Sequence, residues 1–281
     1  MNTSKNTLVW FITGASAGFG KALTEYAVSK GYNVVSTARR KQKLESLAAI
    51  APDQILPIQM DVTNTSEIKA AVAEAMEKLG RIDVLINNAG YGIVGALEET
   101  PEDELRKQLE TNFFGAIAVT QEVLPHLRKA GKGAIVNMSS MGGNMSFGGF
   151  SAYSVSKFAL EGASEALAQE VAPFGIKTMI VEPGAFRTDF AGEALKHMPK
   201  IDAYDEVVGG TRDFAKGMDG TQEGDPKKAA EAIDKALQVE NTPLRLQLGE
   251  DSIEAVKGYA EALLKELEEW RAVGTDTKID G

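Results

Sequence analysis

The stretch LVWFITGASAGFG, residues 8–20, joins a short apolar run to three closely spaced glycines. The apolar part has the character of a buried strand, and a helical pattern begins directly after the last glycine. Gly14, Gly18 and Gly20 let the backbone turn tightly and approach a pyrophosphate, whose charge then lies at a helix N-terminus. We therefore expect a strand, a glycine-rich turn and a helix that together bind a dinucleotide.

The rest of the chain repeats this alternation of apolar runs and helical patterns. Such alternation predicts right-handed crossovers, and hence a doubly wound α/β fold in which helices cover both faces of a parallel sheet. No linker or repeat divides the chain, so we expect one domain over residues 1–281. The strands are expected at residues 8–13, 33–37, 55–60, 82–86, 133–139, 176–181 and 244–248.

Two late segments depart from the alternation. Residues 189–221 mix apolar side chains with glycines, which suits a mobile lid over an apolar substrate. A packed helical insertion without a gating role is the alternative. The tail, residues 250–281, is expected to be helical, and its apolar stripe is more often that of a docked terminal helix than of a partner site.

Composition limits the function. The net charge of −10 argues against general nucleic-acid binding, which needs clustered basic residues. The chain has no cysteine, and its two histidines, His126 and His197, are far apart, so we expect no metal site. The N-terminal apolar run is too short for a signal peptide or a membrane span. We expect a cytoplasmic protein that does not bind membranes.

A second stretch carries the reactive side chains: SSMGGNMSFGGFSAYSVSKFAL, residues 139–160. Tyr153 and Lys157 are four residues apart, on one face of an expected helix, and Ser140 ends the preceding strand. A nearby cation should lower the pKa of the phenol, and the serine hydroxyl should position the same substrate oxygen. The set suits proton transfer to a carbonyl or from an alcohol. Taken alone, however, a tyrosine and a lysine at this spacing are more often an ordinary amphipathic edge.

The end of the second expected strand favours NADP over NAD. The position that commonly reads the ribose is Ala38, and an acid there would have repelled a 2′-phosphate. Arg39, Arg40, Lys41 and Lys43 follow, and arginine binds a phosphate through two parallel hydrogen bonds. A solvated basic turn is the alternative.

Several motifs in register resemble those of the classical short-chain dehydrogenases and reductases. They are TGASAGFG at 13–20, NNAG at 87–90, Asn112, YSVSK at 153–157 and PGAFRT at 183–188, and the resemblance covers roughly residues 8–248. It implies a Rossmann-like sheet with the strand order 3-2-1-4-5-6-7. The implied reaction is hydride transfer between NADP(H) and a carbonyl or secondary alcohol. Apolar residues in the expected lid favour a small to medium hydrophobic substrate.

The resemblance also implies residue roles. Ser140, Tyr153, Lys157 and Asn112 form the catalytic set, in which Tyr153 is the general acid or base and Asn112 bends its helix and holds a water near Lys157. A basic residue at Arg39 marks NADP preference, although Ala17 lacks the second basic residue of some members. The implied cofactor-binding set is Gly14, Ser16, Gly18, Phe19, Gly20, Arg39, Arg40, Asp61, Val62, Asn88, Ala89, Gly90, Tyr153, Lys157, Pro183, Gly184 and Thr188.

Two other functions use the same motifs. An NADP-dependent epimerase or dehydratase would consume no net cofactor. A redox-sensing regulatory protein would bind NADP(H) without turnover, but such a protein is expected to lack one of the three reactive side chains. By resemblance, we also expect a homodimer or homotetramer built from the helices near residues 101–128 and 151–172.

Overall fold

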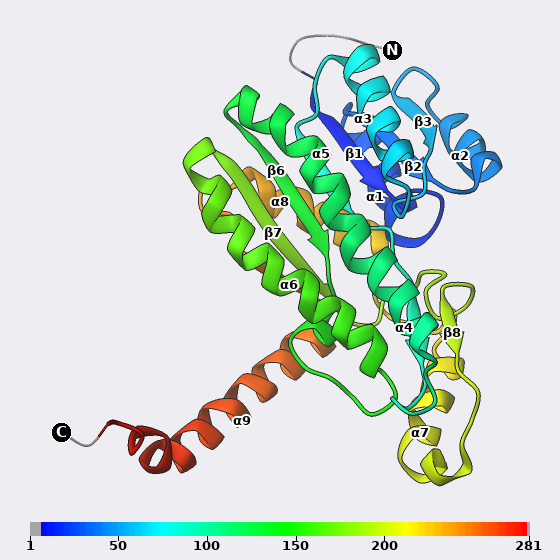
Figure 1. Cartoon of the computed structure of the whole chain (residues 1–281). Coiled ribbons are helices and arrows are strands. Elements are labelled where there is room, and N and C mark those ends of the chain that lie inside the picture. The colour runs from blue at the N-terminus through cyan, green and yellow to red at the C-terminus, as the bar shows by residue number, and fades with distance from the viewer. Residues whose placement is uncertain (1–6, 280–281) are drawn as a thin grey trace.

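A seven-stranded parallel sheet forms the centre of the molecule, which we describe from a computed structural model over residues 7–279 (Figure 1). Its strand order, β3-β2-β1-β4-β6-β7-β9, confirms the expected order, because β5 and β8 belong to a separate small sheet. The strands are β1 (Val9–Thr13), β2 (Asn33–Ala38), β3 (Ile55–Gln59), β4 (Val84–Asn87), β6 (Gly133–Met138), β7 (Ile176–Pro183) and β9 (Arg245–Leu248).

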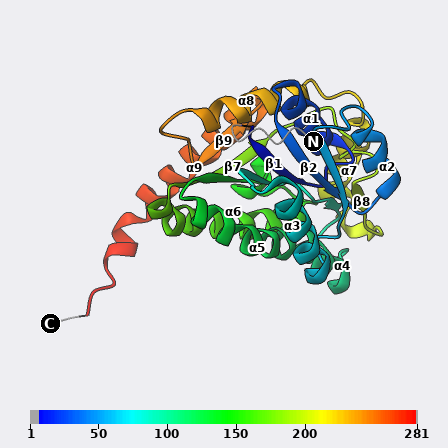
Figure 2. The same cartoon turned by 90° about the horizontal axis from the view of Figure 1, so that it is seen from above.

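Helices cover both faces of the sheet, as Figure 2 shows from above. Side chains of β1 alternate between the two cores, with Trp10 in one and Phe11 in the other, and both are fully buried. Burying a side chain of this size contributes about 2–3 kcal/mol, so each core holds its helices against the sheet. One face carries α1 (Gly18–Ser29), α2 (Lys41–Ala48) and α8 (Pro226–Gln238), and the other carries α3 (Thr65–Leu79), α5 (Gly115–Ala130) and α6 (Ser151–Val171).

Polar residues fix where the covering helices begin. The Asn64 side chain accepts hydrogen bonds from the backbone N–H groups of Ser66 and Glu67 at the start of α3. Asp225 does the same for Lys227 at the start of α8. These caps satisfy N–H groups that lack helical partners, and so they stabilise the first turn of each helix.

The insertion between β7 and α8 packs against the body through its own small sheet. Strand β5 (Gly92–Val94) pairs in parallel with β8 (Leu195–His197), and α7 (Asp205–Gly217) follows. The face of α7 that carries Val208, Arg212 and Ala215 is buried. That face anchors the segment to the body, whereas movement of the segment as a lid stays a prediction.

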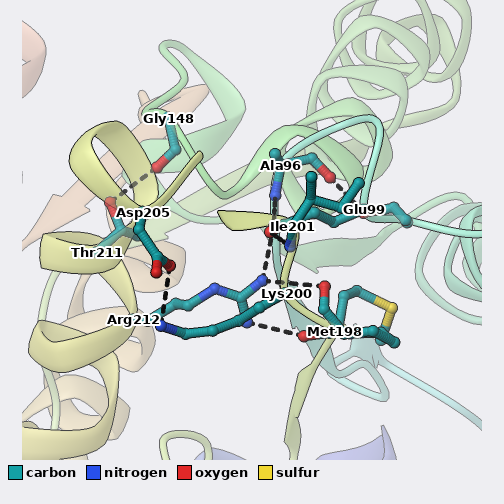
Figure 3. A network of polar contacts seen from close by, with 11 residues as sticks. Ala96, Glu99, Gly148, Met198, Lys200, Ile201, Asp205, Thr211 and Arg212 are labelled. Atoms are coloured by element: carbon teal, nitrogen blue, oxygen red, sulfur yellow. Dashed lines mark hydrogen bonds and ion pairs between the residues drawn. The ribbon is translucent and has the colours of Figure 1, made fainter. Parts of the chain in front are cut away.

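A buried ion pair fastens α7 to the segment after β5 (Figure 3). Arg212 Nη2 lies 2.6 Å from Glu99 Oε2, and their side chains are only 4% and 1% exposed. The carboxylate also accepts from the backbone N–H groups of Ala96 and Ile201, and Arg212 Nη1 donates to the Met198 carbonyl at 2.8 Å. The polar atoms of both side chains are thus extensively paired within the apolar surroundings.

Helix α9 (Glu250–Thr275) leaves the body, in contrast to the docked terminal helix that we expected (Figures 1 and 2). Its first turn is held because Ser252 Oγ donates to the Glu182 carbonyl at 2.8 Å. Every described residue from Lys257 onward is exposed. The stripe predicted from the sequence exists, but this chain provides no surface that covers it along the described residues.

Within residues 7–279, no helix is both long enough and apolar enough to cross a membrane. The expectation about the N-terminus also concerns residues 1–6, which lie outside the described part of the chain.

Replacing Arg212 should destabilise the fold. Arg212→Met leaves the Glu99 carboxylate buried without its partner, so the free energy of unfolding should fall by about 3 kcal/mol. Urea denaturation followed by circular dichroism measures this change. The control is Lys200→Met, because Lys200 pairs with Asp205 on the surface, and the loss there should stay below about 1 kcal/mol. Equal losses in the two variants would contradict the role of the buried pair.

Candidate active site

A cleft with a volume of about 1350 Å³ lies at the carboxyl ends of the central strands. The fold brings the sequence-predicted residues together there: all of them line the cleft except Gly20 and Asn112. Parallel strands deliver their last residues to one edge, so motifs that are distant in sequence meet at one site.

The glycine turn forms one wall. Gly14 has φ of +65°, and a Cβ there would come within 2.8 Å of the Ala89 Cα. Gly20 does not line the cleft, because it packs against the turn itself, where a Cβ would collide with the Gly14 carbonyl oxygen. Helix α1 begins at Gly18 with no side-chain cap and no acid in its first turn. Its N-terminus is therefore suited to an anion.

The NNAG segment after β4 holds this wall to the next strand. Thr13 Oγ1 accepts from the backbone N–H groups of Asn88 and Ala89 at 2.9 and 3.0 Å. In return, Asn88 Nδ2 donates to the carbonyls of Thr13 and Gly14. These four hydrogen bonds hold the carboxyl ends of the neighbouring strands β1 and β4 together at the edge of the cleft.

Ser140, Tyr153 and Lys157 form the opposite wall. Ser140 follows β6, and its Oγ accepts from the Gly142 N–H at 3.1 Å. Lys157 is buried, its Nζ donates to the Met138 carbonyl at 2.7 Å, and the same nitrogen lies 5.7 Å from the centre of the Tyr153 ring. The strand end and one turn of α6 thus place a hydroxyl, a phenol and an ammonium along one side of the cleft.

The pKa of the phenol differs from our expectation. Burial raises the pKa of Tyr153 to about 12, and a hydrogen bond with Ser140 opposes that rise without cancelling it. Burial also lowers the pKa of Lys157 to about 8. We expected the lysine to lower the pKa of the phenol, but burial is the largest influence on that pKa and the lowering comes from Ser140. At neutral pH the Tyr153 phenol is therefore protonated.

Asn112 lies behind the cleft, in a π-helical turn (Glu110–Phe114) between α4 (Glu102–Leu109) and α5. Its Nδ2 donates to the Tyr91 carbonyl at 2.9 Å and to Ser156 Oγ at 3.0 Å, and its Oδ1 accepts from the Tyr91 N–H. A π-turn is a local distortion of a helix, which agrees with the bend implied at this residue. Its part in holding a water stays a prediction.

A buried cluster of polar side chains behind Lys157 was not predicted from the sequence. Glu161, one helical turn further along α6, is 3% exposed, and Glu182 at the end of β7 is 0% exposed. Arg245 Nε lies 3.1 Å from a carboxylate oxygen of each, and Ser139 Oγ donates to Glu161 at 2.6 Å. The spacing of Glu161, four residues after Lys157, was the signal that could have found it.

This cluster acts on Lys157 electrostatically. The Glu161 carboxylate raises the pKa of Lys157, against the larger effect of burial. Burial raises the pKa of Glu161 itself to about 7. Glu161 thus changes charge near neutral pH, and its ionised form favours the protonated form of Lys157.

The basic residues of the predicted turn differ in whether they have an ion-pair partner. Arg40 Nη1 lies 2.8 Å from Glu193 Oε2, and Lys43 lies 3.5 Å from the same oxygen, so this acid of the insertion reaches across to the turn. Arg39 lines the cleft and forms no ion pair with any other described residue. Of the two arginines, Arg39 is the one available to a ligand.

Known proteins resemble the chain over nearly its whole length. Oxidoreductase BOA17 of Botryotinia fuckeliana is 40% identical over 266 residues, covering 94% of this chain and 97% of that protein. A 3-ketodihydrosphingosine reductase of Bacteroides thetaiotaomicron is 39% identical over 247 residues, covering 85% and 86% respectively. A solved short-chain dehydrogenase from Streptomyces avermitilis is 49% identical, with a TM-score of 0.93, and the match covers 98% of this chain and 100% of that one.

The family model for short chain dehydrogenases matches residues 8–199, which include the glycine turn, the NNAG segment and the Ser140, Tyr153 and Lys157 wall. These matches confirm the resemblance expected from the motifs. The chain belongs to the short-chain dehydrogenase family of oxidoreductases.

Proposed function

We propose that this protein transfers a hydride between NADP(H) and a carbonyl or secondary alcohol on a small to medium hydrophobic substrate. The observation that carries the proposal is the meeting of Ser140, Tyr153 and Lys157 on one side of a cleft whose other side is the glycine turn. The uncapped N-terminus of α1 and the close backbone at Gly14 fit a dinucleotide pyrophosphate. When bound, the nicotinamide supplies the redox chemistry, and the protein supplies position and protons.

In the reductive direction Tyr153 gives its proton to the carbonyl oxygen as that oxygen becomes an alcohol. The raised pKa of Tyr153 keeps the phenol protonated at neutral pH, which suits this direction. The Ser140 hydroxyl donates a hydrogen bond to the same oxygen and fixes its position. The ammonium of Lys157, 5.7 Å from the ring centre, then stabilises the phenolate that is left.

The substrate side of the cleft is aromatic. The rings of Phe150 and Phe190 have centroids 6.2 and 5.5 Å from that of Tyr153, and Phe147, Phe214 and Met218 also line the cleft. Such walls bind an apolar substrate body by removing it from water. The Bacteroides relative is named for reducing a keto compound, which favours reduction of a carbonyl here.

Arg39 supports NADP as the cofactor. It faces the cleft without an ion-pair partner among residues 7–279, and Ala38 places no carboxylate beside it. A guanidinium in this position gives a 2′-phosphate two charge-assisted hydrogen bonds. Arg40 is the weaker candidate, because a phosphate would have to replace its surface ion pair with Glu193.

We also propose a homodimer or homotetramer in the cytoplasm. Exposed Phe114, Val155 and Phe158 at the π-helical turn and on α6 support an interface near the expected helices. Such side chains on one face of a protein commonly mark contacts between subunits.

Tyr153→Phe is the direct test of the proposed chemistry. The variant keeps the ring but removes the proton that is transferred, so kcat for carbonyl reduction should fall by roughly a hundredfold or more. NADPH binding, measured by fluorescence, should be unchanged. Tyr204→Phe is the matched control, because Tyr204 bonds Glu98 on the surface and should keep full activity. Full turnover in Tyr153→Phe would refute the assignment.

Glu161→Gln should move the pH profile of the reduction. The wild-type carboxylate raises the pKa of Lys157, so removing its charge lets the ammonium lose its proton at lower pH. The alkaline limb of kcat/KM should then move down by roughly one pH unit. Glu165→Gln, which removes an exposed partner of Arg245, is the control and should leave that limb in place. If the alkaline limb of kcat/KM stays in place in Glu161→Gln, the proposed effect of Glu161 on the reaction is contradicted.

Arg39→Ala should weaken NADPH binding roughly tenfold, because a charged hydrogen-bonding partner of the 2′-phosphate is lost. NADH binding should stay the same. Arg40→Ala is the matched control, and its effect on NADPH should be smaller because Glu193 already pairs with Arg40. Titration of each cofactor by fluorescence measures both constants. Equal weakening of NADPH and NADH by Arg39→Ala would contradict the phosphate assignment.

A further inference from the structure

The C-terminal part of α9 is a helical arm with an uncovered apolar stripe. We define the arm as residues 253–275, and Figures 1 and 2 show it projecting away from the body. Leu264 is 64% exposed and Trp270 is 62% exposed. The large apolar side chains of the stripe are Ile253, Tyr259, Leu263, Leu264, Leu267, Trp270 and Val273, all of them exposed.

This arrangement is unfavourable for a chain on its own. Most of the stability of protein helices comes from packing an apolar face rather than from helix propensity, and the body covers little of the stripe on this arm. The opposite face of the arm is polar, with Glu254, Glu261, Lys265 and Glu268. The exposed stripe is therefore the side on which a partner would stabilise the helix.

The spacing of the stripe identifies the kind of partner. Apolar residues recur at alternating steps of three and four, which is the a and d pattern of a two-stranded coiled coil. The pattern runs for about three heptads, which is long enough for paired arms to interlock side chains along their length. The a and d positions are Ile253, Val256, Ala260, Leu263, Leu267 and Trp270.

The flanking charges select a second copy in parallel orientation. Glu266 lies at a g position and Arg271 at the following e position, so in a parallel pair each Glu266 faces the Arg271 of the other arm. In an antiparallel pair the e positions face one another, which would bring Lys257 against Arg271. Within one chain Arg271 bonds Glu268, but both side chains are about 60% exposed, and such a pair is weak enough to exchange partners.

We propose that the arm is an interaction surface for a second copy of this chain, and that two arms pair in parallel through the stripe. A lipid surface fits less well, because the polar face of the arm is mainly acidic, whereas helices that lie on anionic membranes carry lysine and arginine there. The proposal rests on the arm alone and is independent of the proposed reaction.

The first test measures mass in solution by light scattering after size exclusion. The wild type should have at least twice the 30.0 kDa of one chain. Leu267→Glu places a charge in the seam and should halve the mass of the assembly, while NADPH binding shows that the body is still folded. Lys265→Glu is the matched control on the opposite face and should leave the mass unchanged.

The second test addresses orientation. Glu266→Arg and Arg271→Glu should each weaken the assembly, because each puts like charges across the seam, and the double variant should restore it. Because the chain has no cysteine, Leu267→Cys introduces a single thiol. In a parallel pair it should form a disulfide between chains under mild oxidation, whereas Lys265→Cys should not.

A wild type that is monomeric at micromolar concentration would overturn the proposal, and so would a Leu267→Glu variant with undiminished mass. Sedimentation of a monomeric wild type with phosphatidylserine vesicles would assign the arm to a membrane instead. Failure of the double charge variant to recover, or of Leu267→Cys to crosslink, would overturn the parallel arrangement.

Discussion

The proposed reaction depends on keeping the Lys157 ammonium charged while it is buried. An isolated cation taken out of water loses its hydration, and it retains its proton only if other groups replace that hydration. Here the Met138 carbonyl accepts from Nζ at 2.7 Å, and the ionised form of Glu161, one helical turn away, raises the pKa of Lys157. The carbonyl ends a central strand and the acid lies on the helix that also carries Tyr153. Strand β6 and helix α6 must therefore keep their positions relative to each other for the lysine to remain charged.

The same constraint explains the polar cluster behind the site. Glu161 and Glu182 are both buried, and two buried carboxylates repel each other unless a cation lies between them. Arg245 on the last strand lies 3.1 Å from an oxygen of each, and so joins α6 to β7 and β9. This connection links the far edge of the sheet to the lysine. Through Arg245 the short strand β9 contacts the cluster behind a cleft that β9 itself does not line.

The features that could be predicted from the sequence are those that depend on local patterns of apolar and polar residues. The strand order and the meeting of Gly14, Ser140 and Tyr153 follow from apolar runs and from the rule that parallel strands end at one edge. The raised pKa of Tyr153 was not predictable, because desolvation depends on rings from distant segments, such as Phe190. The contact of Glu193 with Arg40 joins residues 153 positions apart and leaves no local signal. The stripe on α9 was visible in the sequence, but whether the body covers it depends on the direction in which the helix leaves β9.

The most direct measurement of the proposed reaction follows the hydride itself. The protein would be incubated with NADPH carrying deuterium at the reactive carbon of the nicotinamide, together with a panel of aldehydes, ketones and diketones. We expect deuterium on the new alcohol carbon of at least one hydrophobic member, as NADPH absorbance falls, and much less product from deuterated NADH. Tight NADPH binding without deuterium transfer to any member, and without oxidation of the corresponding alcohols, would contradict the account and would favour a cofactor-binding regulatory protein.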